Sequence, residues 1–179
     1  DSFYMEMKKD YAPEMVTVFI RLNGATVGCV ANRSEVYTDG EKTATYDAAL
    51  TAAGCEKAAA FVNFCNAFEI PVLTLVNVDG YKNCKCNEKK IAKAAARLTY
   101  AFANADVPKV TVVVGKANGT AGLTMNSKSI GSDIVYAWKN AKIGVMEAAP
   151  AVKIMYADEI AKADNAAALI NEKAAQYNE

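Results

Sequence analysis

The sequence predicts an α/β protein with a mixed, mostly parallel sheet and packing helices. Two apolar, β-branched runs, Val72–Val78 and Val110–Val114, have the composition of buried parallel strands. Helical periodicity precedes the first run, over residues 56–69, and separates the two, over residues 88–105. The order strand, helix, strand, helix, strand favours parallel pairing through right-handed crossovers.

The first elements are predicted from turn and face signals. Met15–Leu22 and Ala25–Ala31 flank Asn23-Gly24, a dipeptide that favours a tight hairpin turn. Residues 32–50 are polar and predict a loop. Residues 56–69 then place apolar side chains on one helical face, namely Ala58, Phe61, Val62, Cys65 and Phe68.

The second half repeats this pattern. Val72–Val78 shows almost no polar alternation, which predicts a strand covered on both faces. After the second helix and strand, the remaining expected elements are a helix from Thr120 to about Ser129, strands at Ile134–Trp138 and Lys142–Met146, and helices at Ala148–Ala163 and Ala166–Tyr177. No repeat or low-complexity linker divides the chain, so residues 1–179 are expected to form one domain.

Composition excludes several classes of function. The chain has no histidine, so a Ser-His-Asp or Cys-His triad, a histidine base and a histidine-ligated metal site are excluded within it. Its 20 basic and 20 acidic residues cancel without forming blocks, which argues against binding nucleic acid or anchoring to a membrane surface. The N-terminus lacks the apolar region of a signal peptide, and we expect a cytoplasmic protein. Because the chain does not begin with Met, we expect it to be a piece of a longer one.

The five cysteines fall into two groups. Cys29, Cys55 and Cys65 lie in or beside apolar runs and are expected to be buried thiols. Cys84 and Cys86 form a C-x-C pair, for which a redox pair, a metal site and an ordinary solvated loop are the alternatives. The spacing is not that of a zinc site, so no metal is expected.

Ligands of open α/β proteins bind beyond the carboxyl ends of the strands. Two loops of this chain follow a predicted buried strand and are therefore candidate ligand sites. These are Val78–Tyr81 and the glycine-rich segment Gly115–Gly122. Small residues at a helix start expose backbone amides that bind an anion or stabilise an oxyanion. The alternative is that Gly119, Ala121 and Gly122 only allow close packing of a helix on a strand. Asp79 is a candidate base, although an aspartate before glycine more often forms a turn.

Much of the chain resembles a known family, in segments that keep a consistent order: Val16–Asn32, Gly54–Val78, Glu88–Gly119 and Met125–Tyr156. The most specific stretches are residues 57–71, Val107–Val110, and Met125–Lys128 before Gly131. Together they resemble the C-terminal half of a biotin-dependent acyl-CoA carboxyltransferase. That family includes the carboxyltransferase subunits of propionyl-, acetyl- and methylmalonyl-CoA carboxylating enzymes and related decarboxylases. The resemblance implies the crotonase-like fold, with the family's N-terminal half and final C-terminal elements absent from this chain.

The resemblance also implies a reaction and its residues. A carboxyl group moves between carboxybiotin, held on a separate carrier domain, and the α-carbon of an acyl-CoA, with backbone amides stabilising the oxyanions. The C-terminal half holds biotin, and the family's donor pattern falls on the amides of Thr120 and Ala121. Implied partners are the N-terminal half, the carrier domain and further copies of the chain, with a membrane involved only indirectly in a decarboxylase pump. The residues implied to contact the cofactor are Gly80, Tyr81, Gly119, Gly122 and Leu123.

The chain departs from the family pattern at both loops. Asn118 replaces an aromatic residue, Thr120 replaces a smaller one, and Val78-Asp79-Gly80-Tyr81 replaces Val-Pro-Gly-Phe. An alternative is therefore a non-catalytic, crotonase-like assembly subunit with a degenerate pocket. A stand-alone hydratase or isomerase is a weaker alternative, because no pair of glutamates lies on these loops.

Overall fold

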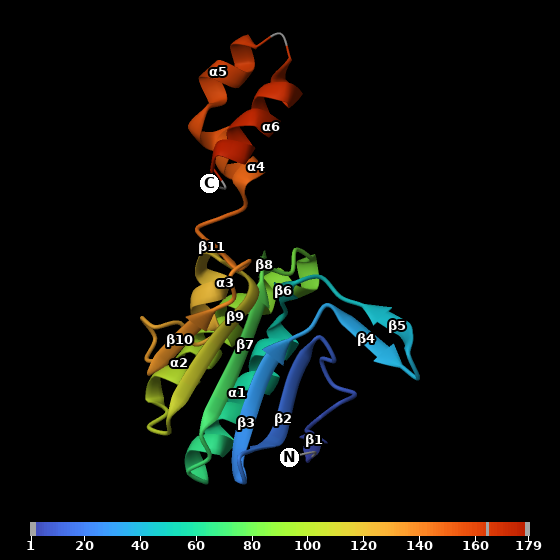
Figure 1. The fold of residues 1–179 in the computed structure, drawn as a ribbon, viewed down its shortest axis with the longest axis vertical. Coiled ribbons are helices and arrows are strands. Elements are labelled where there is room, and N and C mark those ends of the chain that lie inside the picture. Colours follow the sequence, from blue (N-terminus) through green and yellow to red (C-terminus); the bar gives the residue numbers. More distant parts are fainter. Residues whose placement is uncertain (1–2, 164, 178–179) are drawn as a thin grey trace. The chain divides into compact units, whose positions relative to one another are not determined.

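The computed structural model describes residues 3–163 and 165–177 of a chain that divides into two compact units, residues 1–143 and 144–179 (Figure 1). Each unit is described here by itself, and the expectation of one domain over residues 1–179 stays a prediction. Among the described residues, no helix combines the length and apolarity that crossing a membrane requires.

A seven-stranded sheet forms the centre of the first unit, in the order β1-β2-β3-β7-β9-β10, with β11 also paired to β9. Strands β1 to β3 pair antiparallel, whereas β3, β7, β9 and β10 pair parallel. This mixed sheet and its covering helices confirm the predicted α/β class. The bounds are Tyr4–Glu6 (β1), Met15–Leu22 (β2), Ala25–Asn32 (β3), Val72–Val78 (β7), Lys109–Asn118 (β9), Ile134–Ala137 (β10) and Lys142–Gly144 (β11).

The β2–β3 hairpin is confirmed. Leu22 pairs with Ala25, so only two residues form the turn. Asn23 and Gly24 have φ angles of 49° and 81°, the left-handed values that a type I′ turn requires at both positions.

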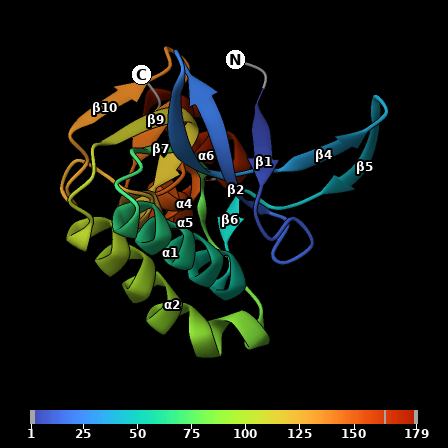
Figure 2. The ribbon, with the colours of Figure 1, turned by 90° about the horizontal axis from the view of Figure 1, so that it is seen from below.

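Helices α1 (Ala52–Ala67) and α2 (Lys85–Asn104) run side by side along the same face of the sheet (Figure 2). Helix α1 begins earlier than predicted because the Thr51 hydroxyl accepts a hydrogen bond from the Gly54 amide, at 2.9 Å. The chain contains 34 alanines, and where these helices meet the core the small alanine side chain permits a close approach of the backbone. The buried alanines of these two helices are Ala52, Ala58, Ala59, Ala94, Ala95 and Ala101.

The prediction that β7 is covered on both faces is wrong for the part of the chain described. Val72, Val76 and Val78 are buried against the helices, but the alternate residues Leu73 and Leu75 are only half-buried. They pack with Val16, Val18 and Cys29 into a smaller cluster on the other face. Helices α1 and α2 cover one side only, so an apolar run does not by itself show that both sides are covered.

The prediction of a loop over residues 32–50 is also wrong, because this segment contains three short strands. Strands β4 (Glu35–Thr38) and β5 (Glu41–Thr45) form an antiparallel hairpin, and β6 (Ala49–Leu50) pairs parallel with β8 (Gly80–Tyr81). The β4–β5 turn is Asp39-Gly40, with φ angles of 53° and 83°. Asp-Gly is a turn signal of the same kind as Asn-Gly, and it was present in the sequence.

Shorter elements complete the chain. Helix α3 spans Gly119–Thr124 and ends well before Ser129. In the second unit, the helix predicted over Ala148–Ala163 is interrupted at Tyr156, and α4 packs against α6. The bounds there are Ala148–Met155 (α4), Ala157–Lys162 (α5) and Ala166–Tyr177 (α6).

Candidate functional site

The two loops predicted from the sequence contact each other at the carboxyl ends of β7 and β9. Asp79 accepts a hydrogen bond from the Asn118 amide, Nδ2 to Oδ1, at 2.7 Å. Its second oxygen, Oδ2, lies 3.1 Å from Lys116 Nζ. The side chains of Asp79 and Lys116 are 36% and 37% exposed, so water screens this ion pair substantially. Asp79 therefore connects the β7 loop to the residues that precede α3.

A bulge in β9 makes these contacts possible. Val76 pairs with Val113 and Val78 pairs with Ala117, so β9 has extra residues between the two pairs. A Cβ at Gly115 would lie 2.3 Å from Asn77 Oδ1, so any larger residue here would require the Asn77 side chain to move. The close approach lets Asn77 Oδ1 accept a hydrogen bond from the Lys116 amide at 3.0 Å.

Asn32 extends the same network to β3. Its Oδ1 accepts a hydrogen bond from the Asn77 amide at 2.9 Å, and its Nδ2 donates to the Asn77 carbonyl. We call Asn32, Asn77, Asp79, Lys116 and Asn118 the strand-end network. Sequence reasoning missed Asn32 and Asn77 as parts of the site, although an asparagine near the carboxyl end of the apolar run Val72–Val78 was an available signal.

Helix α3 starts directly after this network. Its N-cap residue Asn118 has an extended backbone, and the Asn118 side chain contacts Asp79 instead of capping the helix. Gly119 adopts a left-handed φ of 56°. The amides of Thr120 and Ala121 lie in the first turn, where no acceptor exists within the helix. Such amides can interact with an anion that approaches the helix start.

The predicted contact residues divide by accessibility. Thr120 is exposed, Leu123 is 48% exposed, and a Cβ at Gly80 would meet no described atom within 4 Å. By contrast, Ala121 is 1% exposed, and a Cβ at Gly122 would lie 2.7 Å from the Ala117 carbonyl carbon. The small size of Gly122 is therefore explained by packing, as the alternative reading of this loop proposed.

Tyr81 connects the two loops at a second point. Its hydroxyl lies 3.1 Å from the hydroxyl of Thr124, at the end of α3. Thr124 also donates a hydrogen bond to the Thr120 carbonyl at 2.9 Å. The Tyr81 ring is half-buried and packs against the main core, so its place beside α3 is fixed by packing.

A second polar network joins β7 to β9 inside the core, and we call it the core network. Asn126 is fully buried with φ 57°, and its Nδ2 donates to Thr111 Oγ1 at 3.0 Å and lies 3.5 Å from Thr74 Oγ1. Thr111 donates in turn to the Asn126 carbonyl at 2.7 Å, and Ser132 Oγ lies 3.1 Å from Thr111 Oγ1. Asn126 Oδ1 has no hydrogen-bond partner within the described residues. These contacts hold the segment after α3 against the sheet.

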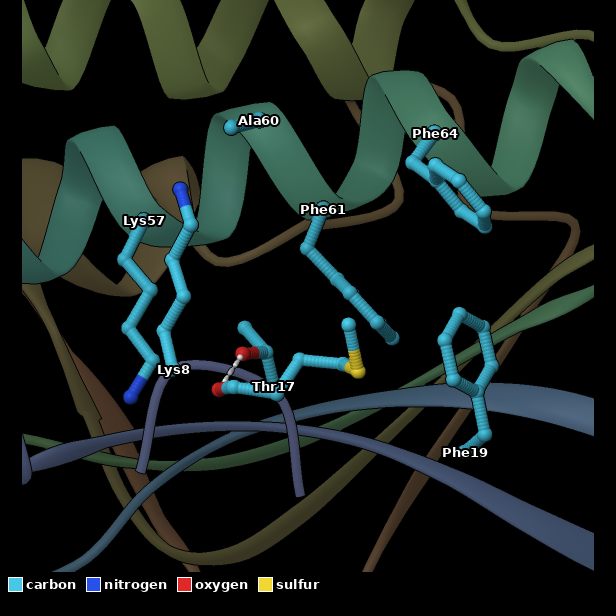
Figure 3. Close-up of a pocket in the computed structure, with 8 residues that line it drawn as sticks. Lys8, Thr17, Phe19, Lys57, Ala60, Phe61 and Phe64 are labelled. Carbon is cyan, nitrogen blue, oxygen red and sulfur yellow. Dashed lines mark hydrogen bonds between the residues drawn. The ribbon is translucent and has the colours of Figure 1, made fainter. Parts of the chain in front are cut away.

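A cavity of ≈ 190 Å³ lies between β2 and α1 and shares no residue with either network (Figure 3). Lys8 and Lys57 line one end, and Phe19 and Phe64 line the other (Figure 3). Lys57 is 2% exposed and donates to the Ala12 carbonyl at 3.3 Å. Burial lowers the pKa of its ammonium group. The cavity is smaller than the roughly 300 Å³ at which ligand pockets begin, so we assign no ligand to it.

Comparisons with known proteins match this chain over nearly its whole length. The model of the family described as "Carboxyl transferase domain" matches residues 1–179. The methylmalonyl-CoA carboxyltransferase 12S subunit of Propionibacterium freudenreichii is 39% identical over 97% of this chain and 32% of its own length. The methylmalonyl-CoA decarboxylase alpha subunit of Propionigenium modestum is 38% identical over 97% of this chain and 32% of its own length.

Solved structures of proteins from the same enzyme classes are also similar to this chain. The transcarboxylase 12S hexamer, crystallised with methylmalonyl-CoA, has a TM-score of 0.87 at 39% identity and covers 98% of this chain. The geranyl-CoA carboxylase beta subunit of P. aeruginosa has a TM-score of 0.81 at 26% identity, also over 98% of this chain. This likeness confirms the expected crotonase-like fold. In both cases the chain spans 32% of the solved chain, about a third of the relative.

Proposed function

Because the chain belongs to the carboxyl transferase domain family, we propose that it is the biotin-binding half of an acyl-CoA carboxyltransferase. In this proposal a carboxyl group moves between carboxybiotin and the α-carbon of an acyl-CoA. The observation that carries it is the meeting of the two strand-end loops at the start of α3, where Asp79 contacts Lys116 and Asn118. The relatives named above supply the substrate class.

The start of α3 is the proposed oxyanion site. The amides of Thr120 and Ala121 would donate to the ureido oxygen, and Gly119 turns the backbone so that the helix begins there. When bound, biotin would supply the carboxyl group and, through its ureido nitrogen, a base, in a chain that has no histidine to serve as one. The fit is supported by the exposure of Thr120 and Leu123 and by the open space at Gly80. Gly80 and Leu123 would line the approach, whereas Ala121 and Gly122 hold α3 against β9.

The departures from the family pattern bear on this proposal. Asp79 and Asn118 both replace family residues, and they are hydrogen-bonded to each other. The Lys116 ammonium lies beside the Asp79 carboxylate and offsets its charge where an anionic group would approach. The residues that differ from the family pattern therefore still connect the loop after β7 to the start of α3, through the contacts of Asp79 with Asn118 and Lys116.

A non-catalytic assembly subunit is the second candidate. The observation that favours it is the Asp79 carboxylate, since a negative charge beside the start of α3 opposes the binding of an anion. In either case, the proposed partners are an N-terminal carboxyltransferase half, a biotin carrier domain and further copies of the chain. The cytoplasmic location also stays a prediction.

The decisive experiment removes one backbone N–H donor from the proposed oxyanion site. Thr120→Pro deletes the backbone N–H of residue 120, and proline is tolerated in the first turn of a helix. In the full-length enzyme we expect carboxyl transfer from methylmalonyl-CoA to the biotinylated carrier to fall about 100-fold or more. The matched variant Thr120→Gly keeps the amide and should retain transfer.

Two results would contradict the proposal. The first is a folded Thr120→Pro enzyme, as judged by circular dichroism, that transfers carboxyl groups at the unmodified rate. The second is an unmodified full-length protein with its carrier that shows no transfer from any acyl-CoA tested, which would support the assembly role.

A further inference from the structure

We propose that Cys84 and Cys86 form a reversible dithiol–disulfide site at the start of α2, oxidised by low-molecular-weight disulfides such as glutathione disulfide. Their two sulfur atoms lie 3.0 Å apart. Cys84 is half-buried and Cys86 is exposed, so a small oxidant can reach both. The proposal does not depend on the function proposed above.

The position of Cys84 explains why the two thiols meet. Side chains two residues apart inside a helix point to different faces and do not contact each other. Cys84 is the N-cap residue of α2, and its extended backbone, with φ −155° and ψ 148°, lies outside helical geometry. This turn of the backbone brings its sulfur to that of Cys86 in the first turn of the helix.

The environment assigns different roles to the two sulfurs. The hydrogen bond between the two thiols lowers the pKa of Cys84, and the Asn87 amide acts in the same direction. The same thiol–thiol bond raises the pKa of Cys86. A thiolate is the reactive form of cysteine, so this direction favours Cys84, at the N-cap of α2, as the nucleophile, with Cys86 in the first turn as the resolving thiol.

The reaction is a pair of thiol–disulfide exchanges. The Cys84 thiolate attacks one sulfur of glutathione disulfide, which forms a mixed disulfide and releases one glutathione thiolate. Cys86 loses its proton to solvent, its thiolate attacks the Cys84 sulfur, and the second glutathione leaves as a thiolate that takes up a proton. The protein loses two electrons and two protons, and one glutathione disulfide becomes two glutathiones.

The other cysteines provide internal controls. Burial raises the pKa of Cys29 to about 11 and the pKa of Cys55 and Cys65 to about 12. These thiols stay protonated near neutral pH and are shielded from oxidant. Among the residues that the structure describes, no group of three or more cysteines, aspartates and glutamates is placed to hold a metal ion.

Oxidation of Cys84 and Cys86 is expected to alter hydrogen bonds in α1 and in the segment after β8. The Cys84 carbonyl accepts hydrogen bonds from the amides of Asn87 and Glu88, at 2.9 and 3.0 Å, and so begins α2. The buried Asn87 side chain accepts from the Ala52 amide at 2.6 Å and donates to the Lys82 carbonyl at 2.8 Å. A disulfide that moves Cys84 disturbs the first turn of α1 and the segment after β8.

Peptide mapping tests the proposal directly. The chain is equilibrated with glutathione buffers of increasing disulfide content, its free thiols are blocked under denaturing conditions, and it is digested with trypsin. Cleavage after Lys85 places the two cysteines on separate peptides, Asn83–Lys85 and Cys86–Lys89. We expect these peptides to become joined by a disulfide as the disulfide content rises, and to separate again after reduction. Hydrogen exchange at the Ala52 amide should increase in the oxidised chain.

Single variants complete the test. Cys86→Ser should stop at the mixed disulfide of Cys84 with glutathione, and Cys55→Ser should leave formation of the joined peptides unchanged. Three results would overturn the proposal: the peptides stay separate in every buffer, the unmodified chain stops at the mixed disulfide, or the joined peptides come from two different chains in a covalent dimer.

Discussion

The strand-end network and the core network both connect β7 to β9, but they differ in charge and in exposure to water. The first contains the ion pair of Asp79 and Lys116, whereas the second contains only neutral amides and hydroxyls. In the strand-end network, Asp79 and Lys116 are more than one-third exposed. In the core network, Asn126, Thr111 and Thr74 are at most 2% exposed. Asn118 of the strand-end network is itself buried, at 5% exposure, but its partner Asp79 is open to water. A hydrogen bond lost there is therefore replaced by water at Asp79, whereas one lost in the core network remains unsatisfied. We therefore expect the core network to determine stability and the strand-end network to determine the placement of the loops.

The largest expected effect is at Asn126. Asn126→Ala removes two buried side-chain hydrogen bonds and places alanine at a left-handed φ, so the free energy of unfolding should fall by about 3 kcal/mol. Asn126→Gly removes the same bonds without the backbone strain and should cost about 1 kcal/mol less than Asn126→Ala. Urea unfolding followed by the fluorescence of Trp138, the only tryptophan, measures both. Asn118→Ala, in the strand-end network, should cost less than about 1 kcal/mol. If Asn126→Ala and Asn118→Ala lowered the free energy of unfolding equally, the two networks would not differ in their contribution to stability.

Thr111 provides the second test of the core network. Thr111→Val keeps the shape of the side chain but removes the hydroxyl that contacts both Asn126 and Ser132. The buried partners lose their hydrogen bonds, so we expect a loss of about 2 kcal/mol. The control is Thr43→Val, at an exposed hydroxyl of the β4–β5 hairpin, with a change within about 0.5 kcal/mol. A neutral Thr111→Val would show that the core network contributes little to stability.

Gly115 tests the close approach within the strand-end network. Gly115→Ala places a methyl group against Asn77 Oδ1, and we expect a cost of about 1 kcal/mol as the asparagine moves. Because the obstacle is one side chain, the cost should nearly vanish when Gly115→Ala is made in an Asn77→Ala background. A double-mutant cycle on unfolding free energies measures this coupling. Additive costs would mean that the bulge itself requires glycine.

The smallest expected effect is the ion pair of Asp79 and Lys116. A cycle of Asp79→Asn and Lys116→Met should give a coupling of about 0.5 kcal/mol at low salt, and 1 M salt should abolish it. The corresponding cycle for Thr111 and Asn126 should not respond to salt, since neither group is charged. A salt-independent coupling at Asp79 would indicate that this pair is shielded from water.

Sequence reasoning succeeded where the signal is local. The Asn23-Gly24 turn, the strands at residues 15–22 and 72–78 and both long helices follow from neighbouring residues and periodicity. Asp39-Gly40 carried an equally local signal, but the polar surroundings led to its prediction as a loop. The two loops of the candidate site were also predicted, because strand ends are recognisable in a sequence.

The contacts between these loops were not predictable in the same way. Asn32 and Asn77 are 45 residues apart, and Asp79 and Asn118 are 39 residues apart, so their pairing depends on the order of strands in the sheet. Burial of Asn126 is a property of tertiary packing, since nothing in the local pattern marks an asparagine as a core residue. For Gly122 the sequence already offered close packing of a helix on a strand as an alternative, and the structure adds the partner, because a Cβ there would meet the Ala117 backbone.

The joining of an antiparallel hairpin to parallel strands in one sheet has a consequence for folding kinetics. The β2–β3 hairpin closes through a two-residue turn and can form within microseconds. The pairings of β3 with β7 and of β7 with β9 each enclose an entire helix, so a larger loop-closure entropy must be overcome first. We expect amides of β2 and β3 to be protected in pulsed hydrogen exchange before those of β7 and β9, with simultaneous protection contradicting this order. The candidate site, built at the ends of the late-pairing strands, would then be among the last parts of the chain to acquire its native geometry.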